Sequence, residues 1–454
     1  MGEFVSSPNP RRAAADLLLR VEQEPVFADQ LIDRELSLGL LQGPDRGLFT
    51  ELVYGVLRRR GTLDHVIGQF SKQPPEKLEP TVLILLRTGL YQLLYLNRVP
   101  VSAAVNETVN LAAAMIPRAK GFINAVLRSA DRGRERITYP DRQRDPVGFL
   151  VATYSHPRWL VEQWLQQLGP VETEALAAAM GEKPPLTARV NTLRITRDEL
   201  LLNLAAAGIT AAPCRYSPLA LTVVATGGVE QLPGFQEGLF TVQDESSQLA
   251  ALLLAPRPGE RVLDLCAAPG GKATLLAQLM ENRGEIVACD LTDAKLLRLE
   301  GSCTRLGISI ITTLRSDATA PPPQFLGSFH RVLVDAPCSG LGVIRRNPEG
   351  KWRKGPHDLE RLAVTQKKIL KAAAGCVAPG GLLLYATCST SERENEAVIN
   401  EFLAAHPQFL LEDGRAEFPH LEELFTERGI FRSWPHRHDA MDGFCAARLR
   451  RTGE

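Results

Sequence analysis

The chain has 454 residues, which is too long for one ordinary hydrophobic core, so two or three domains are expected. An apolar content of 44% suits a globular protein, and the apolar runs stop short of the ~20 residues of a membrane-spanning helix. The 52 basic and 52 acidic residues cancel, which excludes a uniformly basic nucleic-acid coat but leaves local basic clusters open. The N-terminus lacks an apolar signal core, so we expect a cytoplasmic protein with no membrane attachment.

Eight cysteines occur singly along the sequence, at positions 214, 266, 289, 303, 338, 376, 388 and 445. The sequence has no Cys-x-x-Cys pair, which argues against a zinc site of that kind and against a disulfide framework. We therefore expect no bound metal. A buried free cysteine is usually an inert packing residue, so chemistry is assigned to one only where a second feature supports it.

The N-terminal part of the chain is predicted to be an all-α bundle. Apolar residues recur at helical spacing in the stretches 13–21, 48–59, 81–96, 103–115 and 122–128. Pro100 separates two of these stretches, and Ser102 is expected to cap the helix that follows. We assign residues 1–140 to this domain. Periodicity alone would leave it an anonymous helical domain.

A polar, charged linker over residues 131–145 leads into a small α/β domain at 146–235. His156-Pro157-Arg158-Trp159 opens a helix, and helical spacing returns at 172–180 and 197–207. Strands are predicted at 187–193, 220–224 and 239–242.

The C-terminal part, residues 236–454, alternates regularly between strand and helix. Strands are predicted at 261–266, 285–290, 310–314, 331–335 and 381–387, and helices at 246–254, 273–280, 294–306 and 359–377. This alternation predicts a doubly wound, mostly parallel sheet. Ligands of such sheets bind beyond the carboxyl ends of the strands, where the strand order reverses.

The first strand of this part runs into a turn of small residues, Cys266-Ala267-Ala268-Pro269-Gly270-Gly271-Lys272. Strand, small-residue turn and helix allow a ligand to approach bare backbone amides, although a tight turn without a ligand would look similar. The Gly-x-Gly-x-x-Gly of nicotinamide dehydrogenases is missing. The turn therefore favours an adenosine ligand with less phosphate, of which S-adenosylmethionine is the main example.

Acidic residues end several of the predicted strands, on the edge where a site belongs. They are Asp264, Asp290, Asp317 and Asp335. An acid at Asp290 can accept hydrogen bonds from both ribose hydroxyls of such a ligand. Cys388 follows the last strand and Cys338 follows Pro337, both at the same edge. A thiolate is soft enough to add to carbon 6 of a pyrimidine, which makes carbon 5 nucleophilic toward a sulfonium methyl group.

Three clusters of basic residues are candidates for RNA contact, although any one alone is more often a solvated surface. The clusters are Arg118, Lys120, Arg128, Arg132, Arg134 and Arg136; Arg345, Arg346, Lys351, Arg353 and Lys354; and Arg428, Arg432, Arg437, Arg448, Arg450 and Arg451.

The motifs Asp264-Leu-Cys-Ala-Ala-Pro-Gly-Gly-Lys272, Asp335-Ala-Pro-Cys-Ser-Gly340 and Thr387-Cys-Ser389 resemble those of RNA cytosine-5 methyltransferases. Val242-Gln-Asp-Glu-Ser-Ser-Gln248 is similar to the segment that precedes the cofactor motif in that family, and Trp434-Pro-His-Arg-His438 with Asp442-Gly-Phe444 also fits. The stretches 53–58, 89–95 and 122–128 resemble a NusB-like RNA-binding domain. Together they are similar to the RsmB (Sun/Fmu) type over nearly the whole chain. Cys445 departs from the pattern, and we expect it to fill core volume.

This resemblance implies a Rossmann-like methyltransferase domain and assigns a role to each site residue. Residues Cys266 to Lys272 would cradle S-adenosylmethionine, Asp290 would bind its ribose and Asp317 its adenine edge. Asp335 would lie between cofactor and base. Cys388 would be the nucleophile, and Cys338 would help to remove the proton from carbon 5 and release the product.

The sequence therefore predicts a methyltransferase that modifies carbon 5 of a cytosine in small-subunit ribosomal RNA, before the subunit is fully assembled. Two alternatives stay open. The first is the same chemistry on transfer RNA, and the second is an RNA-binding assembly factor whose methylation site is vestigial.

Overall fold

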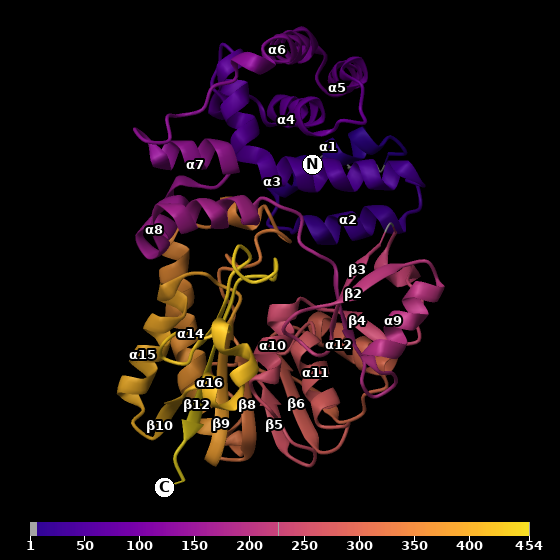
Figure 1. The fold of residues 1–454 in the computed structure, drawn as a ribbon. Coiled ribbons are helices and arrows are strands. Elements are labelled where there is room, and N and C mark those ends of the chain that lie inside the picture. Colours follow the sequence, from indigo (N-terminus) through magenta and orange to yellow (C-terminus); the bar gives the residue numbers. More distant parts are fainter. Residues whose placement is uncertain (1–6, 226, 454) are drawn as a thin grey trace. The chain divides into compact units, whose positions relative to one another are not determined.

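The computed structural model describes residues 7–225 and 227–453 of the chain (Figure 1). The internal contacts divide the chain into two compact units. The first unit comprises Met1–Lys183 and Ile344–Lys354, and the second comprises Pro184–Val343 and Gly355–Glu454. The expected division into three domains, with boundaries near residues 140 and 235, stays a prediction.

The first unit is helical, as predicted. Its α-helices are α1 (Pro10–Gln23), α2 (Ala28–Ser37), α3 (Pro44–Phe70), α4 (Pro80–Tyr95), α5 (Val101–Met115), α6 (Lys120–Arg132), α7 (Pro146–Tyr154), α8 (Arg158–Met180) and α13 (Gly350–Arg353). The prediction that Ser102 caps α5 is wrong, because the helix already begins at Val101 and has no side-chain cap. Pro100 cannot extend a helix, and its extended ψ of 140° lets the new helix start at the next residue.

The core of this unit is built from the apolar faces of the predicted helices. Leu18, Leu52, Leu86 and Leu127 are fully buried in one cluster. Gly89 allows α4 and α6 to approach closely, since a Cβ there would lie 2.8 Å from a methyl carbon of Leu127. Among the described residues, no helix combines the length and the apolar character needed to cross a membrane.

The segment Ile344–Lys354 belongs to the first unit although it interrupts the second in sequence. Lys351 is fully buried, and its Nζ lies 3.3 Å from the carbonyl oxygen of Arg58. The guanidinium of Arg353 donates to the carbonyl oxygens of Val26 and Glu24. The second basic cluster is therefore not simply the surface patch that its charges suggested, because Lys351 and Arg353 donate to backbone carbonyl oxygens of the same unit and Lys351 is buried.

The second unit begins with a small antiparallel sheet of strand order β2-β3-β1-β4. Its strands are β1 (Thr187–Val190), β2 (Thr210–Pro213), β3 (Ala220–Val224) and β4 (Phe240–Val242), with helix α9 (Arg197–Ala206). Sequence reasoning missed β2, which has the burial pattern of an exposed edge and no apolar alternation.

The large sheet has the strand order β10-β12-β9-β8-β5-β6-β7, with β11 paired to β12. Its strands are β5 (Arg261–Asp264), β6 (Glu285–Asp290), β7 (Ile311–Arg315), β8 (Phe329–Asp335), β9 (Val377–Thr387), β10 (Phe409–Glu412), β11 (Phe431–Ser433) and β12 (Phe444–Arg451). The neighbouring strands from β9 to β7 are parallel, which confirms the predicted doubly wound sheet.

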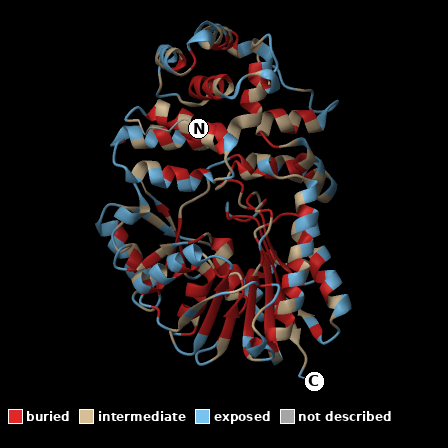
Figure 2. Cartoon of the chain, turned by 180° about the vertical axis from the view of Figure 1, so that it is seen from behind, coloured by how far each residue is buried: buried red, intermediate tan, exposed pale blue. Residues whose placement is uncertain are grey.

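Helices cover both faces of this sheet. They are α10 (Glu245–Leu252), α11 (Gly271–Leu279), α12 (Asp293–Leu306), α14 (Pro356–Cys376) and α15 (Glu396–Ala405), and the short α16 (Gly414–Glu417) follows β10. Val262 packs in the cluster with α10, α11 and α12, whereas its neighbour Leu263 packs with α14 and α15. Because successive side chains of a strand point to opposite faces, both faces are buried. Figure 2 shows these strands as buried over most of their length.

The antiparallel edge formed by β10, β11 and β12 was not predicted, and it explains the third basic cluster. Arg448 and Arg450 on β12 both pair with Glu412 on β10. Arg432 on β11 is buried beside Glu396. These three arginines join neighbouring elements at the sheet edge, whereas Arg428 and Arg437 of the same cluster are exposed. Cys445 is fully buried in the core, as expected.

Candidate active site

The candidate site lies at the carboxyl edge of the large sheet, where the strand order reverses. The chain runs outward from β5 through β6 to β7 and then returns to place β8 on the other side of β5. Such a reversal leaves a crevice between the loops that leave the two central strands. Asp264 ends β5 and Asp335 ends β8.

The small-residue turn links β5 to α11 and leaves backbone amides at the helix N-terminus. β5 ends at Asp264, two residues earlier than predicted, so Cys266 belongs to the turn. Gly270 has a φ of 108°, and a Cβ there would lie 2.8 Å from Leu299. The Ala267 amide donates to the Cys289 carbonyl of β6, which ties the turn to the next strand. Only glycine fits the left-handed position that ends the turn.

A buried arginine of the small sheet supports this turn, and sequence reasoning missed it. Arg189 on β1 is fully buried and donates to the Gly271 carbonyl, to Gln243 and, at 3.0 Å, to Thr274 Oγ1. Burial lowers the pKa of Arg189 to about 9. A lone arginine inside the apolar Thr187–Val190 strand was the available signal, because such a charge is buried only when it has several partners.

The carboxylates at the ends of β5 and β6 have unequal surroundings. Asp264 is fully buried; one of its oxygens accepts from the Cys266 amide at 3.3 Å, and Oδ2 has no hydrogen-bond partner. Burial, with the nearby charge of Asp335, raises its pKa to about 8. Asp290 accepts from the amide and hydroxyl of Thr292 through Oδ1. Both acids therefore retain acceptor capacity at the edge of the sheet.

The other two predicted acids differ from each other. Asp335 forms an ion pair with Lys272, with Nζ 2.8 Å from Oδ2, and the same ammonium lies 4.6 Å from the ring centroid of Phe444. Lys272 thus points toward Asp335 and not along the backbone of its own turn. Asp317 is exposed and accepts from the Thr319 amide and hydroxyl, which lower its pKa.

The two predicted cysteines lie together. The Sγ atoms of Cys338 and Cys388 are 3.3 Å apart, and both thiols are free. The Gly342 amide donates to the Cys388 carbonyl at 2.9 Å, and the Gly443 amide donates to the Gly342 carbonyl at 3.0 Å. The hydrogen bond to Cys388, together with burial, raises the pKa of Cys338 well above its ordinary value. Two adjacent thiols can act as a nucleophile and a proton carrier.

A buried carboxylate, Glu394, lies behind the two cysteine loops and was not singled out from the sequence. Its oxygens accept from the Ser339 amide at 2.8 Å, the Ser389 hydroxyl at 2.5 Å and the Gln366 amide group at 3.0 Å, and also from the Ser339 hydroxyl. The signal that could have found it is a glutamate six residues after Cys388 in an otherwise polar turn. That signal is weak, because surface turns also contain glutamate.

The C-terminal motif packs against the same edge. The Asp442 amide donates to Asp244, the residue that caps α10 in the Val242–Gln248 segment. The Trp434 amide donates to Nδ1 of His438, and burial lowers the pKa of His438 to about 4. Two motifs that are far apart in the sequence thus join one site.

The first basic cluster lies on the helical unit and is the most exposed of the three. Arg118, Lys120, Arg128, Arg132 and Arg136 are partly or fully exposed, although Arg118 pairs with Glu79. This cluster is the strongest candidate among the three for contact with phosphates, and the exposed Arg428 and Arg437 of the third cluster also remain candidates.

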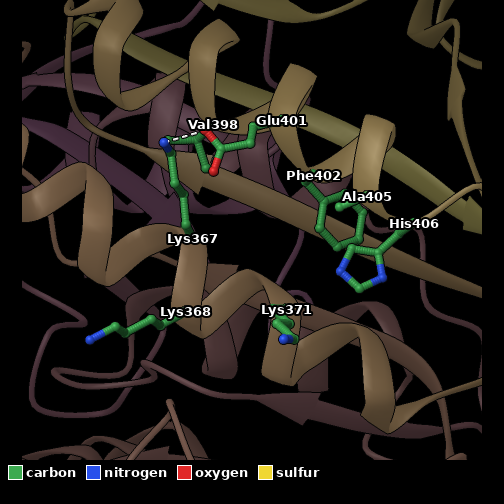
Figure 3. A pocket seen from close by; sticks show the side chains of 8 residues that line it. All are labelled: Lys367, Lys368, Lys371, Val398, Glu401, Phe402, Ala405 and His406. Atoms are coloured by element: carbon green, nitrogen blue, oxygen red, sulfur yellow. Dashed lines mark hydrogen bonds and ion pairs between the residues drawn. The ribbon is translucent and has the colours of Figure 1, made fainter.

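A cavity of about 190 Å³ lies between α14 and α15, and neither Cys338 nor Cys388 lines it (Figure 3). It is lined by Lys367, Lys368, Lys371, Val398, Glu401, Phe402, Ala405 and His406. Lys367 and Glu401 form an ion pair across it. Among the residues that the structure describes, no group of three or more potential ligands is arranged to hold a metal ion.

Profiles of three protein families match successive parts of the chain. They are the 16S rRNA methyltransferase RsmB/F family at residues 251–450, the NusB family at 8–132 and the RsmF/B-like ferredoxin-like domain at 156–230.

Relatives align along nearly the full length of the chain. A probable ribosomal RNA small subunit methyltransferase B of Synechocystis sp. is 39% identical, over 97% of this chain and 99% of the relative. A protein of the same description from Bacillus subtilis is 38% identical over 98% and 99%. The crystal structure of PH0851 is similar with a TM-score of 0.80 and 29% identity, over 99% of this chain and 100% of that chain.

Proposed function

Since the chain belongs to the RsmB/F methyltransferase family, we propose that it transfers a methyl group from S-adenosylmethionine to carbon 5 of a cytosine in small-subunit ribosomal RNA. The observation that carries the proposal is the pair of thiols 3.3 Å apart at the switch point of the sheet. A single reactive cysteine would suffice for addition to a base. A second, adjacent thiol can also remove the proton from carbon 5, so that the first cysteine is released from the methylated base.

The residues at the carboxyl ends of β5 and β6 fit an adenosine-type methyl donor. Asp264 offers a buried oxygen without a partner, and Asp290 offers acceptor capacity for ribose hydroxyls. The turn before α11 consists of small residues, and Gly270 takes the left-handed conformation directly before the first helical amides. When bound, S-adenosylmethionine supplies an electrophilic methyl group on a sulfonium. The residues Cys266, Ala267, Ala268, Pro269, Gly270, Gly271, Lys272, Asp290, Asp317 and Asp335 would hold it.

In the proposed reaction, Cys388 and Cys338 act in sequence on the base. The Cys388 thiolate would add to carbon 6, and the electron pair released at carbon 5 would form the bond to the methyl group as the methyl–sulfonium bond breaks, leaving its electron pair on the sulfur of S-adenosylhomocysteine. Once Cys388 is a thioether, its free thiol no longer forms the hydrogen bond that is the largest cause of the raised pKa of Cys338. Cys338 can then lose its proton to solvent and, as a thiolate, take the proton from carbon 5. The double bond re-forms and the bond between carbon 6 and Cys388 breaks, which restores the Cys388 thiolate.

The RNA is proposed to be held by the helical unit. A NusB-type profile covers residues 8–132, and the exposed basic cluster around α6 lies in this part of the chain. Phosphate contact and counterion release would supply most of the affinity. The cytosine must also leave its stack to reach two thiols inside the catalytic unit, so a loop or mismatched cytosine should react faster than a paired one.

The proposal is tested by bisulfite sequencing of RNA from a strain that lacks the gene. We expect one cytosine of the small-subunit ribosomal RNA to lose its methyl group, and the wild-type gene but not Cys388→Ala to restore it. Purified protein should transfer tritium from labelled S-adenosylmethionine to the same RNA. Tritium label found on transfer RNA alone would show that the substrate is transfer RNA and not ribosomal RNA. An assembly defect rescued by Cys388→Ala, with no methylation in either strain, would favour the non-catalytic alternative.

A further inference from the structure

We infer that Glu394 is a positioning residue that holds the two cysteine loops in one register. This inference rests on the proposed function, because the separation of the two thiols matters for catalysis only if both act on the base. Its evidence is geometric. Glu394 is fully buried, yet it lies six residues after Cys388 and more than fifty after Cys338.

The hydrogen bonds of Glu394 go to the immediate neighbours of both cysteines. Ser339, next to Cys338, donates its amide to Oε1 at 2.8 Å and its hydroxyl to Oε2. Ser389, next to Cys388, donates its hydroxyl to Oε2 at 2.5 Å. The two serine hydroxyls are themselves 3.0 Å apart. One carboxylate therefore joins the two loops at the positions adjacent to the reactive sulfurs.

Gln366 of α14 extends this connection. Its amide group donates to Oε1 of Glu394 at 3.0 Å and to the carbonyl oxygen of Pro337 at 3.0 Å. The Pro337 carbonyl belongs to the residue that precedes Cys338. Each loop is thus held from more than one direction, and every bond has Glu394 or its direct partner at one end.

The neighbouring residues of β9 fix Glu394 in turn. Tyr385 donates its hydroxyl to the Glu394 carbonyl at 2.6 Å. The side chain of Asn395 accepts from the Thr387 hydroxyl at 2.5 Å and donates to the Ser389 carbonyl at 2.9 Å. The turn that carries Glu394 therefore cannot move without moving the end of β9, where Cys388 lies.

A charged group is expensive to bury, and its retention needs several donors. Glu394 has them, and all four of its side-chain hydrogen bonds come from protein groups. An apolar residue of the same size would close the core at less cost but would leave the two serine hydroxyls and the Ser339 amide without this acceptor. The carboxylate is the group that can accept from both loops at once, because each oxygen offers two lone pairs.

The test measures the approach of the two sulfurs without any methyl transfer. The full-length protein is treated with diamide, whose N=N bond takes the two thiol hydrogens as a Cys338–Cys388 disulfide forms. Mass spectrometry then follows the rate of disulfide formation. Glu394→Asp keeps the charge but shortens the side chain by one methylene group, so it cannot reach both serines. We expect the rate to fall about tenfold or more, since effective molarity drops steeply when groups are misplaced by ~1 Å.

Glu401→Gln is the matched control. Glu401 is an exposed glutamate of α15 that pairs with Lys367, as Figure 3 shows. Its replacement should leave the rate of disulfide formation unchanged. Ser389→Ala removes one donor to Glu394, together with the acceptor of the Ser391 amide, and is the second test variant if Glu394→Asp does not fold. It should slow disulfide formation by a few-fold, less than Glu394→Asp, because Ser339 and Gln366 stay bound.

The catalytic readout separates positioning from a merely structural role. In folded Glu394→Asp we expect a lower kcat with an unchanged KM for S-adenosylmethionine, because the substitution leaves the residues at the ends of β5 and β6 unchanged. A wild-type rate of disulfide formation in folded Glu394→Asp or in Ser389→Ala would overturn the inference. A wild-type protein that forms the disulfide rapidly but never methylates RNA would instead contradict the proposed function and leave the geometry standing.

Discussion

The two halves of the sheet edge are built on opposite principles. On the side of β5 and β6, acceptor groups are left open: Asp264 has a buried oxygen without a partner, and the contacts of Asp290 use Oδ1. On the side of β8 and β9, polar groups bond mainly to one another, as the four bonds to Glu394 show, and Oε1 of Gln366 is the network oxygen left without a partner among the described residues.

This difference reflects what each half has to do. A half that receives a ligand needs unsatisfied acceptors, because the ligand supplies the missing donors on binding. A half that holds two reactive sulfurs at one separation needs a rigid scaffold, because small displacements reduce reactivity strongly.

The largest effect is expected from the cysteines, and it tests the half on the side of β8 and β9. Cys388→Ala removes the nucleophile, so methyl transfer should fall by on the order of 10⁴-fold or more and the protein–RNA adduct should vanish. Cys338→Ala should still form the bond to carbon 6 but fail to break it. That variant should accumulate as a covalent RNA adduct, visible as a slowly migrating band on a denaturing gel.

The reverse pattern, with an adduct in Cys388→Ala and none in Cys338→Ala, would exchange the two roles. Full activity in both variants would contradict the covalent mechanism. Cys445→Ala is the control, since this thiol is buried in the core and its removal should cause no adduct to accumulate.

A smaller effect, of a few kcal/mol, is expected from the buried acid of the open half. The pKa of Asp264 is raised from 3.8 to about 8 in the folded protein. As pH rises from about 4 to 8, the unfolded chain loses this proton while the folded protein keeps it, so stability falls over that window. The asparagine of Asp264→Asn cannot ionise, so the stability of this variant should not fall over that pH window for this reason.

The measurement is the thermal midpoint of both proteins between about pH 5 and pH 9, without cofactor. The midpoint of Asp264→Asn relative to wild type should rise with pH by several degrees. Asp317→Asn, at an exposed position, should show no such trend. Parallel curves for Asp264→Asn and wild type would show that Asp264 is ionised in the folded protein at neutral pH.

Cofactor affinity provides the next test of the open half. Asp290→Ala should weaken binding of S-adenosylmethionine by ~1.5 to 3 kcal/mol, the range for hydrogen bonds to a charged group. Isothermal calorimetry measures the dissociation constant directly. Asp293→Ala, which removes an exposed acid three residues away, should bind normally. An unchanged dissociation constant in folded Asp290→Ala would show that a residue other than Asp290 binds the ribose.

The smallest effect per residue is expected outside both halves, on the helical unit. Replacing Lys120, Arg128 and Arg132 by glutamine should weaken RNA binding and make its salt dependence shallower. The slope should change by ~0.7 to 0.9 for each phosphate that these side chains no longer neutralise. Filter binding at several salt concentrations measures both quantities. Cofactor affinity should not change.

Arg283→Gln offers a matched removal of charge at an exposed position of the catalytic unit. If it weakens RNA binding as much as the α6 variants do, the basic cluster has no special role. If the α6 variants bind RNA with the wild-type salt slope, the helical unit does not contact the phosphates through this cluster.

Sequence patterns determined the elements whose periodicity is strong. The predicted bundle helices and the parallel strands all exist, because an amphipathic helix or a strand buried on both faces shows its environment in its own residues. The motifs also placed Cys338 and Cys388 at one edge, since parallel strands bring their carboxyl ends together. Local signals were less reliable at element ends, as the unused cap at Ser102 and the early end of β5 show.

The tertiary structure decided which charges are exposed and which groups meet. Lys351 and Arg448 are charged in the sequence like any surface residue, but distant carbonyls and carboxylates surround them in the interior. The sequence around Glu394 likewise gives only a weak signal of its role, because its partners come from loops and a helix elsewhere in the chain. Whether a polar residue is solvated or buried depends on partners that no local window contains, and only the folded chain brings those partners together.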